Sequence, residues 1–198
     1  MKRSAPTNEP DDATLVRETL AGDRRAFDLL VLRHADMLFN LCNRMLGDYD
    51  EASDCAQDAF IRAYRGLESF RGDAAFATWL YRIALNTCKN RLASAEYRRA
   101  RKAVRLEGGG ADDAIVPASG RLSHSDPEAR LERGEREAII QRALDDLPPD
   151  EKAVAVLCDI EGKSYEETAA LTGIPLGTVK SRLARARRRL RPKLEGIV

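Results

Sequence analysis

The sequence contains few histidines and cysteines, the residues on which most metal sites and many catalytic sites depend. It has 198 residues, with two histidines, His34 and His124, and four cysteines that form no CxxC pair. The cysteines are Cys42, Cys55, Cys88 and Cys158. Because they are scattered over apolar positions of helical stretches, we expect buried free thiols in a reducing cytoplasm, with no metal site and no cofactor. A metal site built from them is the alternative that the sequence leaves open.

Long apolar runs are also absent. No uninterrupted apolar segment approaches the length of about 18 residues that a membrane span needs, and the polar residues 1–12 lack the apolar core of a targeting segment. We therefore expect a cytoplasmic protein with no membrane insertion. The 33 Lys and Arg residues almost balance the 32 Asp and Glu residues. Only local clusters of charge can therefore indicate a partner.

The residue patterns of an enzyme active site are missing as well. There is no pair of carboxylates on a defined strand, no nucleophile elbow and no histidine-centred cluster. The triple glycine at 108–110 is neither preceded by an apolar strand nor followed by Gly-Lys-Ser/Thr, as a phosphate loop requires. We therefore expect a protein without catalytic activity.

Helical periodicity is the main signal that the sequence does contain. Apolar residues recur at steps of three, four and seven in four stretches, 27–45, 52–67, 76–84 and 131–147. His34 lies on the first apolar stripe, which indicates a packing role, and Gly47 is expected to end that helix. Asp73 is a natural N-cap for the third helix. The pattern predicts an all-α fold.

The periodic stretches fall into two groups. Residues 107–126 have no periodicity, few large apolar side chains, and several Gly, Asp and Ser residues, which predicts a linker. We therefore expect two small helical domains joined by a flexible linker. The expected order is a disordered N-terminus at 1–11, a first domain at 12–95, a basic helix end and linker at 96–126, and a second domain at 127–198.

The end of the sequence has the pattern of a helix-turn-helix. Ser164 and Glu167 can form a capping box at the start of one helix, and Gly173 permits a tight turn before the next. From Thr178 to Leu194 the second helix carries eight cations and no acid, which favours binding to duplex DNA. The candidates for base edges are Lys180, Ser181, Ala184 and Arg185, and those for phosphates are Arg182, Arg187, Arg188, Arg189 and Arg191.

Charge is clustered in the first domain too. Acidic residues dominate positions 48–58, with no base between Arg44 and Arg62, and predict a contact with a basic partner surface. Eight cations from Arg82 to Arg105 are accompanied by a single acid. They lie close to aromatic and amide side chains, Phe70, Trp79, Tyr81 and Asn86, as a surface for unstacked bases requires. A core role is the favoured interpretation of Trp79, and Asn86 is the better candidate for reading a base.

Several segments resemble the extracytoplasmic-function (ECF) sigma factors of the sigma-70 family, most closely their envelope-stress, sigma-E-like branch. They are DCAQDAFIRAY at 54–64, FRGD at 70–73, TWLYRIALN at 78–86, DLP at 146–148, YEETA at 165–169 and GTVKSR at 177–182. These segments follow one another in the family's order. The resemblance implies a polymerase-binding helix, a loop and helix that open and read the −10 promoter element, and a module that reads the −35 element.

The resemblance assigns residues to each of these roles. Those implied to bind polymerase are Asp54, Gln57, Asp58, Phe60 and Ile61. Those implied at the −10 element are Phe70, Arg71, Gly72, Asp73, Trp79, Arg82, Asn86 and Lys89. Those implied at the −35 element are Thr178, Lys180, Ser181, Arg182, Ala184, Arg185 and Arg188.

The function implied is that of an RNA polymerase sigma factor that directs transcription initiation of a stress or envelope regulon. Its partners would be core RNA polymerase, duplex −35 DNA, single-stranded −10 DNA and, by analogy alone, an anti-sigma factor. A simple helix-turn-helix repressor or activator is the alternative, although it leaves the first hundred residues without a role. An enzyme that handles nucleotides or phosphate is the second alternative, and no residue pattern favours it.

Overall fold

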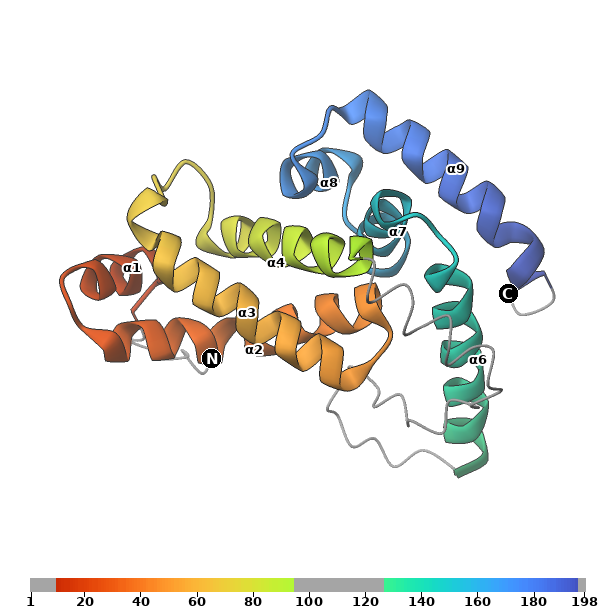
Figure 1. Ribbon diagram of the computed structural model, residues 1–198, viewed down its shortest axis with the longest axis horizontal. Helices are drawn as coiled ribbons and strands as arrows, with labels where there is room; N and C mark the ends of the chain where they lie inside the picture. The colour runs from red at the N-terminus through yellow and green to blue at the C-terminus, as the bar shows by residue number, and fades with distance from the viewer. Residues whose placement is uncertain (1–9, 95–126, 196–198) are drawn as a thin grey trace, which may run out of the picture.

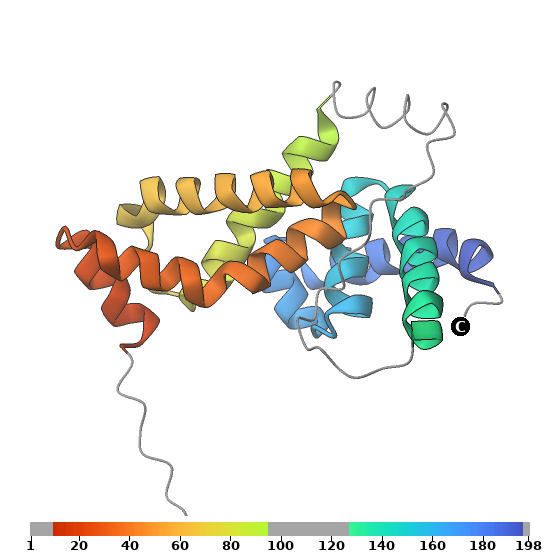
Figure 2. The ribbon, with the colours of Figure 1, turned by 90° about the horizontal axis from the view of Figure 1, so that it is seen from below.

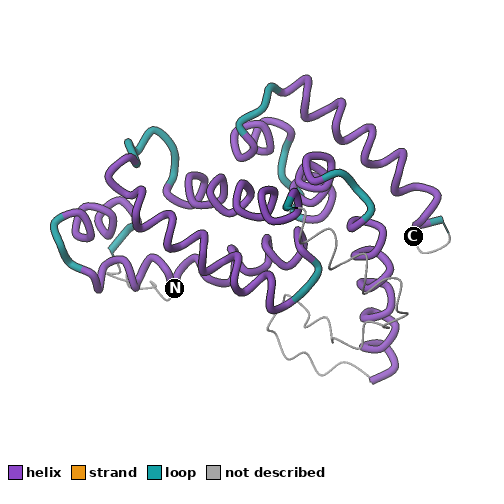
Figure 3. Tube along the Cα trace, viewed as in Figure 1, coloured by secondary structure: helices purple, strands orange, loops and turns teal. Residues whose placement is uncertain are grey.

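The computed structural model describes residues 10–94 and 127–195, and every regular element in these ranges is helical (Figures 1 and 3). The first group is α1 (Asp12–Leu20), α2 (Arg24–Leu46), α3 (Tyr49–Gly66), a 3-10 turn (Leu67–Ser69) and α4 (Phe76–Ala93). The second is α6 (Pro127–Asp145), α7 (Pro149–Ala155), a π-helical turn (Val156–Ile160), α8 (Tyr165–Thr172) and α9 (Leu176–Leu194). The predicted all-α class is confirmed. The predicted linker and most of the predicted disordered N-terminus lie outside the described residues.

Local sequence signals place most of the helix ends. The Asp23 side chain accepts a hydrogen bond from the backbone N of Arg25 at 2.9 Å at the start of α2. Gly47 ends α2 in the left-handed conformation, with φ 71°, which a residue with a Cβ adopts only at a cost. The expected cap at Asp73 is wrong. The N-cap of α4 is Ala75, whose carbonyl accepts from Thr78 N, and Asp73 lies too far upstream to reach the first turn.

The first domain is a bundle in which α2, α3 and α4 lie side by side and α1 packs on α2. Its core is made of aliphatic side chains such as Leu38, Leu41 and Leu80, all fully buried. The predicted packing role of His34 is confirmed. His34 is buried, its Nε2 lies 2.9 Å from Asp12 Oδ2, and its ring centroid lies 5.5 Å from that of Phe76. This contact joins α1, and Phe76 at the start of α4, to the middle of α2.

The second domain contains the predicted helix-turn-helix. The capping box forms as expected: Ser164 Oγ accepts from Glu167 N at 3.1 Å, and Glu167 Oε2 accepts from Ser164 N at 2.7 Å. Gly173 then makes the turn with φ 70°. Val179 and Leu183 of α9 pack on Val154 of α7, and all three are buried. This packing turns the basic side of α9 outward.

The two domains pack against each other, a relationship that the sequence leaves open. Helix α8 lies over the middle of α4 and α7 lies beside its C-terminal half (Figures 1 and 2). Buried residues of both domains form one continuous apolar cluster. At Gly47 a Cβ would lie 2.6 Å from the Gln141 side chain of α6, so this glycine also permits close contact between the domains. Among the described helices, none is apolar over enough of its length to cross a membrane.

Candidate functional site

The outer face of α9 presents the residues predicted for duplex DNA. Val179, Leu183 and Ala186 are buried on the inner side of the helix, which leaves the opposite side to solvent. The predicted residues Lys180, Ser181, Ala184, Arg185 and Arg188 are all exposed, and Thr178 and Arg182 are half-buried at the edge of this face. A helix whose N-terminal half projects exposed polar side chains past a tight turn is suited to the major groove.

Acids from other elements neutralise part of α9. No acid lies in the sequence from Thr178 to Leu194, but the fold brings α7 and the π-helical turn beside it. The ion pairs are Arg182–Asp150 at 2.9 Å, Arg185–Glu151 at 3.3 Å, Arg189–Glu151 at 3.1 Å and Arg187–Asp159 at 2.6 Å. Lys180 and Arg188 have no acidic group within 4.0 Å among the residues that the structure describes. Arg191, which is also predicted for phosphates, has no such acidic partner among these residues either, so a phosphate can meet these three cations without competition from a carboxylate.

The loop before α4 and the start of α4 form an aromatic cluster. The ring centroids of Phe70 and Trp79 are 5.2 Å apart, and both rings lie 5.8 Å from the ring of Phe76. Phe76 is buried, whereas Phe70 and Trp79 are half-buried and lie against the core of the domain. The predicted loop residues Arg71, Gly72 and Asp73 are exposed next to this cluster. The arrangement places partly exposed aromatic rings beside a polar loop.

Further along α4, the exposed side chains meet the second domain. Asn86 is exposed, as its predicted role requires. The guanidinium of Arg82 donates a hydrogen bond to the carbonyl of Ala170 in α8 at 2.7 Å. Lys89 Nζ lies 2.6 Å from Asp150 Oδ1 in α7. Two of the cations predicted for single-stranded DNA are therefore bound by the helix-turn-helix domain.

Tyr81 and Arg91 do not have the environments expected from the sequence. Tyr81 is 5% exposed, and its hydroxyl donates a hydrogen bond to Glu161, so it offers no face to an unstacked base. Burial, reinforced by the neighbouring carboxylate, raises the pKa of Tyr81. Arg91 bonds to Glu51 and lies 3.6 Å from Asp54 Oδ2, so it neutralises the acidic side of α3 instead of extending the basic surface. Helical spacing cannot reveal either contact, because both partners come from other elements.

The acidic residues predicted for polymerase are solvent-accessible. The side chains of Asp54 and Asp58 are 68% and 51% exposed, and Arg91 NH1 lies 3.9 Å from Asp58 Oδ2. These acids give the surface of α3 a negative charge. Arg91 reduces this charge but does not cancel it. An exposed surface of this kind remains suited to a basic partner.

A groove of about 870 Å³ lies between α2 and α3. Three of the residues predicted for polymerase line it, namely Gln57, Phe60 and Ile61. Sequence reasoning missed the other wall, which α2 supplies through Phe27, Val31 and Phe39. Phe27 is buried in the core and Val31 and Phe39 are half-buried against it. Periodicity indicates such an apolar face, but it does not show that the face also borders a groove. An apolar groove with acids on one side is suited to docking another protein.

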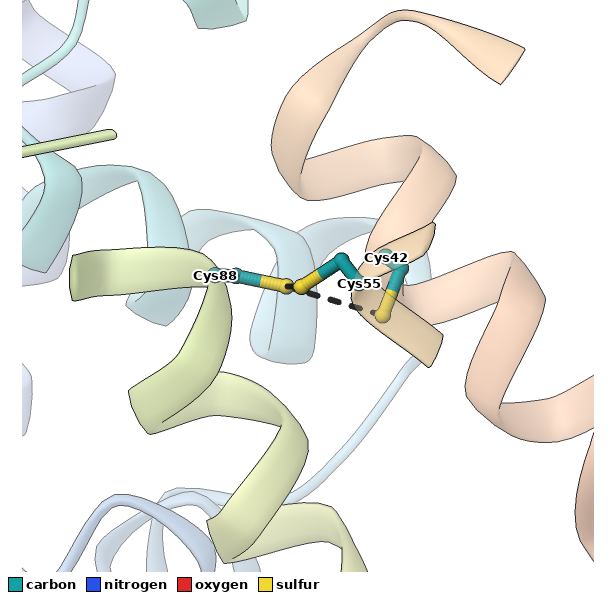
Figure 4. Close-up of side chains that lie close together, drawn as sticks. All are labelled: Cys42, Cys55 and Cys88. Atoms are coloured by element: carbon teal, nitrogen blue, oxygen red, sulfur yellow. Dashed lines mark hydrogen bonds between the residues drawn. The ribbon is translucent and has the colours of Figure 1, made fainter. Parts of the chain in front are cut away.

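Three of the four cysteines meet in the core of the first domain (Figure 4). Cys42, Cys55 and Cys88 are fully buried free thiols, which confirms the expected burial, and Cys158 is half-buried. The thiols of Cys42 and Cys88 hydrogen-bond to Cys55 and hold its pKa below the ordinary value. Their meeting was missed because each belongs to a different helix.

Comparisons with known proteins agree on one family. Residues 30–99 match the family model of sigma-70 region 2, and residues 137–190 match that of sigma-70 region 4. The chain is 40% identical over 191 residues to the RNA polymerase sigma-H factor of Pseudomonas aeruginosa, covering 96% of this chain and 97% of that protein. It is 41% identical over 194 residues to the ECF RNA polymerase sigma-E factor of Escherichia coli K12, covering 94% and 96%.

Two solved structures have a similar fold. CnrH in complex with the cytosolic domain of CnrY superimposes with a TM-score of 0.62 at 29% identity, covering 93% of this chain and 97% of that one. The sigma factor RpoE in complex with the anti-sigma factor NepR from Bartonella quintana gives 0.54 at 26% identity, covering 86% and 97%. The chain therefore belongs to the extracytoplasmic-function sigma factors of the sigma-70 family, which are non-enzymatic factors of transcription initiation.

Proposed function

We propose that three surfaces of this sigma factor divide the work of promoter recognition. The outer face of α9 reads the −35 duplex, the Arg71–Asp73 loop with the exposed face of α4 reads the opened −10 strand, and the groove between α2 and α3 binds core polymerase. We take residues 12–95 as the domain for polymerase and the −10 element, and residues 127–198 as the −35 domain. The observation that carries the proposal is that the three surfaces lie on different elements, each with the chemistry that its partner requires.

The assignment at the −35 element rests on exposure and charge. Lys180, Ser181, Ala184 and Arg185 project from the first half of α9, where a recognition helix contacts base edges. Arg188 lies further along the same face and has no acidic partner among the described residues. We therefore assign base edges to the first group and phosphates to Arg182 and Arg188, where neutralisation gives affinity and register but no sequence information.

The assignment at the −10 element rests on the exposed amide of Asn86 beside cations and partly exposed aromatic rings. A base that has left the stack needs a hydrogen-bonding group for its Watson–Crick edge, and Asn86 both donates and accepts. Arg82 and Lys89 lie one turn to either side of it and supply charge for the strand. Phe70 and Trp79 offer ring surface beside the exposed loop.

The closed arrangement of the domains makes the free protein a weak promoter binder. Arg82 is bound by Ala170 and Lys89 by Asp150, so the surface for the −10 strand is partly covered by the −35 domain. Core polymerase, by binding the groove and separating the domains, would release these cations. Specific initiation then belongs to the holoenzyme and not to the isolated factor.

Regulation is proposed from the relatives. CnrH and RpoE were each solved with a partner protein, named for RpoE as an anti-sigma factor. We infer that an anti-sigma factor also holds the present chain inactive, that the chain acts in the cytoplasm with RNA polymerase, and that it serves a stress or envelope regulon. The likeness to ECF sigma-E factors supports this assignment.

Co-purification with core RNA polymerase tests the proposal. The full chain should form a stable complex with core enzyme and direct initiation from promoters that the core enzyme alone does not use. A simple helix-turn-helix repressor would instead bind duplex DNA tightly without polymerase. Sequence-specific binding of the free chain to duplex DNA at physiological salt, with no holoenzyme formed, would contradict the proposed division of surfaces.

A further inference from the structure

Three thiols from three helices converge at one point of the first domain (Figure 4). Cys42 lies in α2, Cys55 in α3 and Cys88 in α4. Cys88 Sγ lies 3.5 Å from Cys55 Sγ and 3.6 Å from Cys42 Sγ, and all three sulfurs lie within 4.8 Å of one another. None of the proposed DNA or polymerase surfaces uses these side chains, which are fully buried.

The spacing of the sulfurs suits a shared metal ion. Sulfurs bound at about 2.3 Å from one ion stand about 3.8 to 4.0 Å apart in tetrahedral or trigonal geometry. The two measured separations are shorter by only a few tenths of an ångström, so a small change in side-chain torsion reaches either geometry. The sulfurs are well beyond the length of about 2.05 Å of a disulfide. Without an ion, the cluster is held only by weak S–H···S hydrogen bonds.

The number of sulfur ligands and their burial indicate which metal ion the site would bind. Thiolates prefer soft ions, chiefly Cu(I), Zn(II) and the iron of iron–sulfur clusters. Structural zinc takes four ligands, and iron–sulfur clusters are also held by four. Within residues 10–94 and 127–195, no further Cys, His, Asp or Glu atom joins the three sulfurs, and full burial gives water no access as a fourth ligand. A closed site with three sulfurs fits Cu(I), which is stable in trigonal coordination.

Positive charge lies close to the cluster. Lys152 of α7 is 1% exposed and interacts electrostatically with the Cys88 thiol, while its ammonium also pairs with Asp145 at 2.8 Å. Arg91, one turn after Cys88 on α4, interacts electrostatically with Cys55, while its guanidinium also bonds to Glu51. Binding one Cu(I) to three thiolates leaves two net negative charges in the core, and these cations reduce the cost of that charge. Three thiol protons leave to solvent, and copper keeps its oxidation state.

We propose that Cys42, Cys55 and Cys88 form a three-sulfur site for one Cu(I) ion that joins α2, α3 and α4. An ion bound by the folded state alone stabilises it by mass action, so copper should raise the thermal stability of the first domain. Because the thiols are buried, the ion enters during folding or local opening. The site does not depend on the proposed DNA and polymerase contacts.

The test uses the full chain, purified without oxygen and loaded with Cu(I) supplied as its acetonitrile complex. One sample is loaded in the native state and another during refolding from denaturant, and both are desalted before copper is measured. We expect one copper per chain in at least the refolded sample, a thiolate-to-copper charge-transfer band, and a higher melting temperature. X-ray absorption of the loaded wild-type chain should count three sulfur neighbours, a result that does not depend on whether any variant folds.

Variants then assign the ligands. Cys55→Ala and Cys88→Ala should lose the retained copper while keeping their helical circular dichroism. Cys158→Ala is the matched control, because Cys158 lies in the second domain against Thr168, and it should retain copper like the wild type. The proposal is overturned if neither loading route retains copper, if folded Cys55→Ala keeps it, if X-ray absorption counts fewer than three sulfurs, or if Zn(II) in excess displaces it.

Discussion

Lys89 Nζ lies 2.6 Å from Asp150 Oδ1, so a cation of α4 in the first domain is paired with a carboxylate of α7 in the second domain. The second oxygen of the same carboxylate lies 2.9 Å from Arg182 NH2 on α9. One side chain thus holds a cation of each predicted DNA-binding surface. The hydrogen bond from Lys89 holds the pKa of Asp150 below its ordinary value, with further help from Arg182.

The first prediction concerns this contact. Asp150→Asn removes the charge that holds Lys89 and Arg182, and it should increase the affinity of the free chain for single-stranded −10 DNA several-fold. Because the folded pKa is lowered, the pair contributes stability above the unfolded value of about 3.9 and loses it as pH falls through the folded pKa. The pair therefore contributes its full stability at neutral pH. A substitution, and not a change of pH near neutrality, is needed to break the contact. Fluorescence anisotropy with a labelled strand measures the change.

A matched control separates the domain contact from a general gain of free cations. Asp159→Asn also releases an arginine of α9, Arg187. This ion pair joins α9 to the π-helical turn within the second domain and involves no residue of α4. It should leave single-strand binding close to the wild-type value. Equal gains in the two variants would mean that added positive charge, and not exposure of α4, explains the effect of Asp150→Asn.

The second prediction concerns Glu161, which is half-buried and accepts a hydrogen bond from Tyr81 of the first domain. Burial raises the pKa of this carboxyl, against the opposing effect of the Tyr81 hydrogen bond. The folded state therefore binds the proton more tightly than the unfolded state, whose pKa is about 4.3. Stability falls as pH rises from that value through the folded pKa. Glu161→Gln keeps an oxygen that accepts from Tyr81 without a partly desolvated charge.

Thermal unfolding at several pH values tests this expectation. Glu161→Gln should melt at a higher temperature than the wild type at neutral pH, and the difference should vanish near pH 4, roughly where the unfolded carboxyl titrates. Glu166→Gln, on the exposed side of α8, is the control and should change little. A lower melting temperature of Glu161→Gln at neutral pH would mean that the charged hydrogen bond outweighs the cost of burial.

The helices could be predicted from the sequence because their signals are local. Gly47, the capping box of Ser164 and Glu167, and the turn at Gly173 each act within one helical turn. Periodicity also indicates which face of each helix is apolar. It does not show that the same face also borders a groove: Phe27 is buried in the core, as the pattern indicates, and still lines the groove between α2 and α3.

Contacts between elements distant in the sequence could not be predicted. Tyr81 and Glu161 are separated by 80 residues, and the burial of Tyr81 depends on how the two domains meet. The thiols of Cys42 and Cys88 are 46 residues apart, and a scattered spacing contains no sign that they converge. The acids that pair with α9 were missed for the same reason, since a charge count along one helix ignores its neighbours.

The third prediction concerns the groove between α2 and α3, the proposed contact with polymerase. Ile61 is 43% exposed at the groove wall, so Ile61→Asp places a charge in an apolar docking surface without disturbing the core. It should strongly reduce holoenzyme assembly while the helical circular dichroism stays unchanged. Charge reversal at Asp54 and Asp58 should also abolish assembly, because it removes the acids that face a basic partner.

Leu32→Asp is the control for Ile61. Leu32 is 74% exposed on α2 and does not line the groove. The same substitution there should leave assembly intact, as measured by size-exclusion chromatography with core polymerase. If both aspartate variants assemble normally, the polymerase contact lies elsewhere on the chain.

The fourth prediction concerns reading of the duplex. Arg185 is half-exposed on the outer face of α9 and pairs with Glu151 at 3.3 Å, a contact that it can exchange for a base edge. Arg185→Ala should cost roughly 1 to 3 kcal/mol at one −35 position. The loss should persist on promoters whose −10 region is already melted, measured by holoenzyme binding to bubble templates. Arg187→Ala, whose guanidinium pairs with Asp159, should cost less and equally for all −35 sequences.

The fifth prediction concerns the opened strand and uses the same templates. Asn86 is exposed on α4, and its amide can meet the edge of a base only after that base has left the duplex stack. Asn86→Ala should therefore spare recruitment to a −35 duplex and reduce discrimination at one −10 base, on bubble and duplex templates alike. Asn90→Ala, also exposed and one turn further along α4, is the matched control and should keep that discrimination. If Asn86→Ala changed no −10 preference while Arg185→Ala impaired only melting, the two domains would have been assigned to the wrong promoter elements.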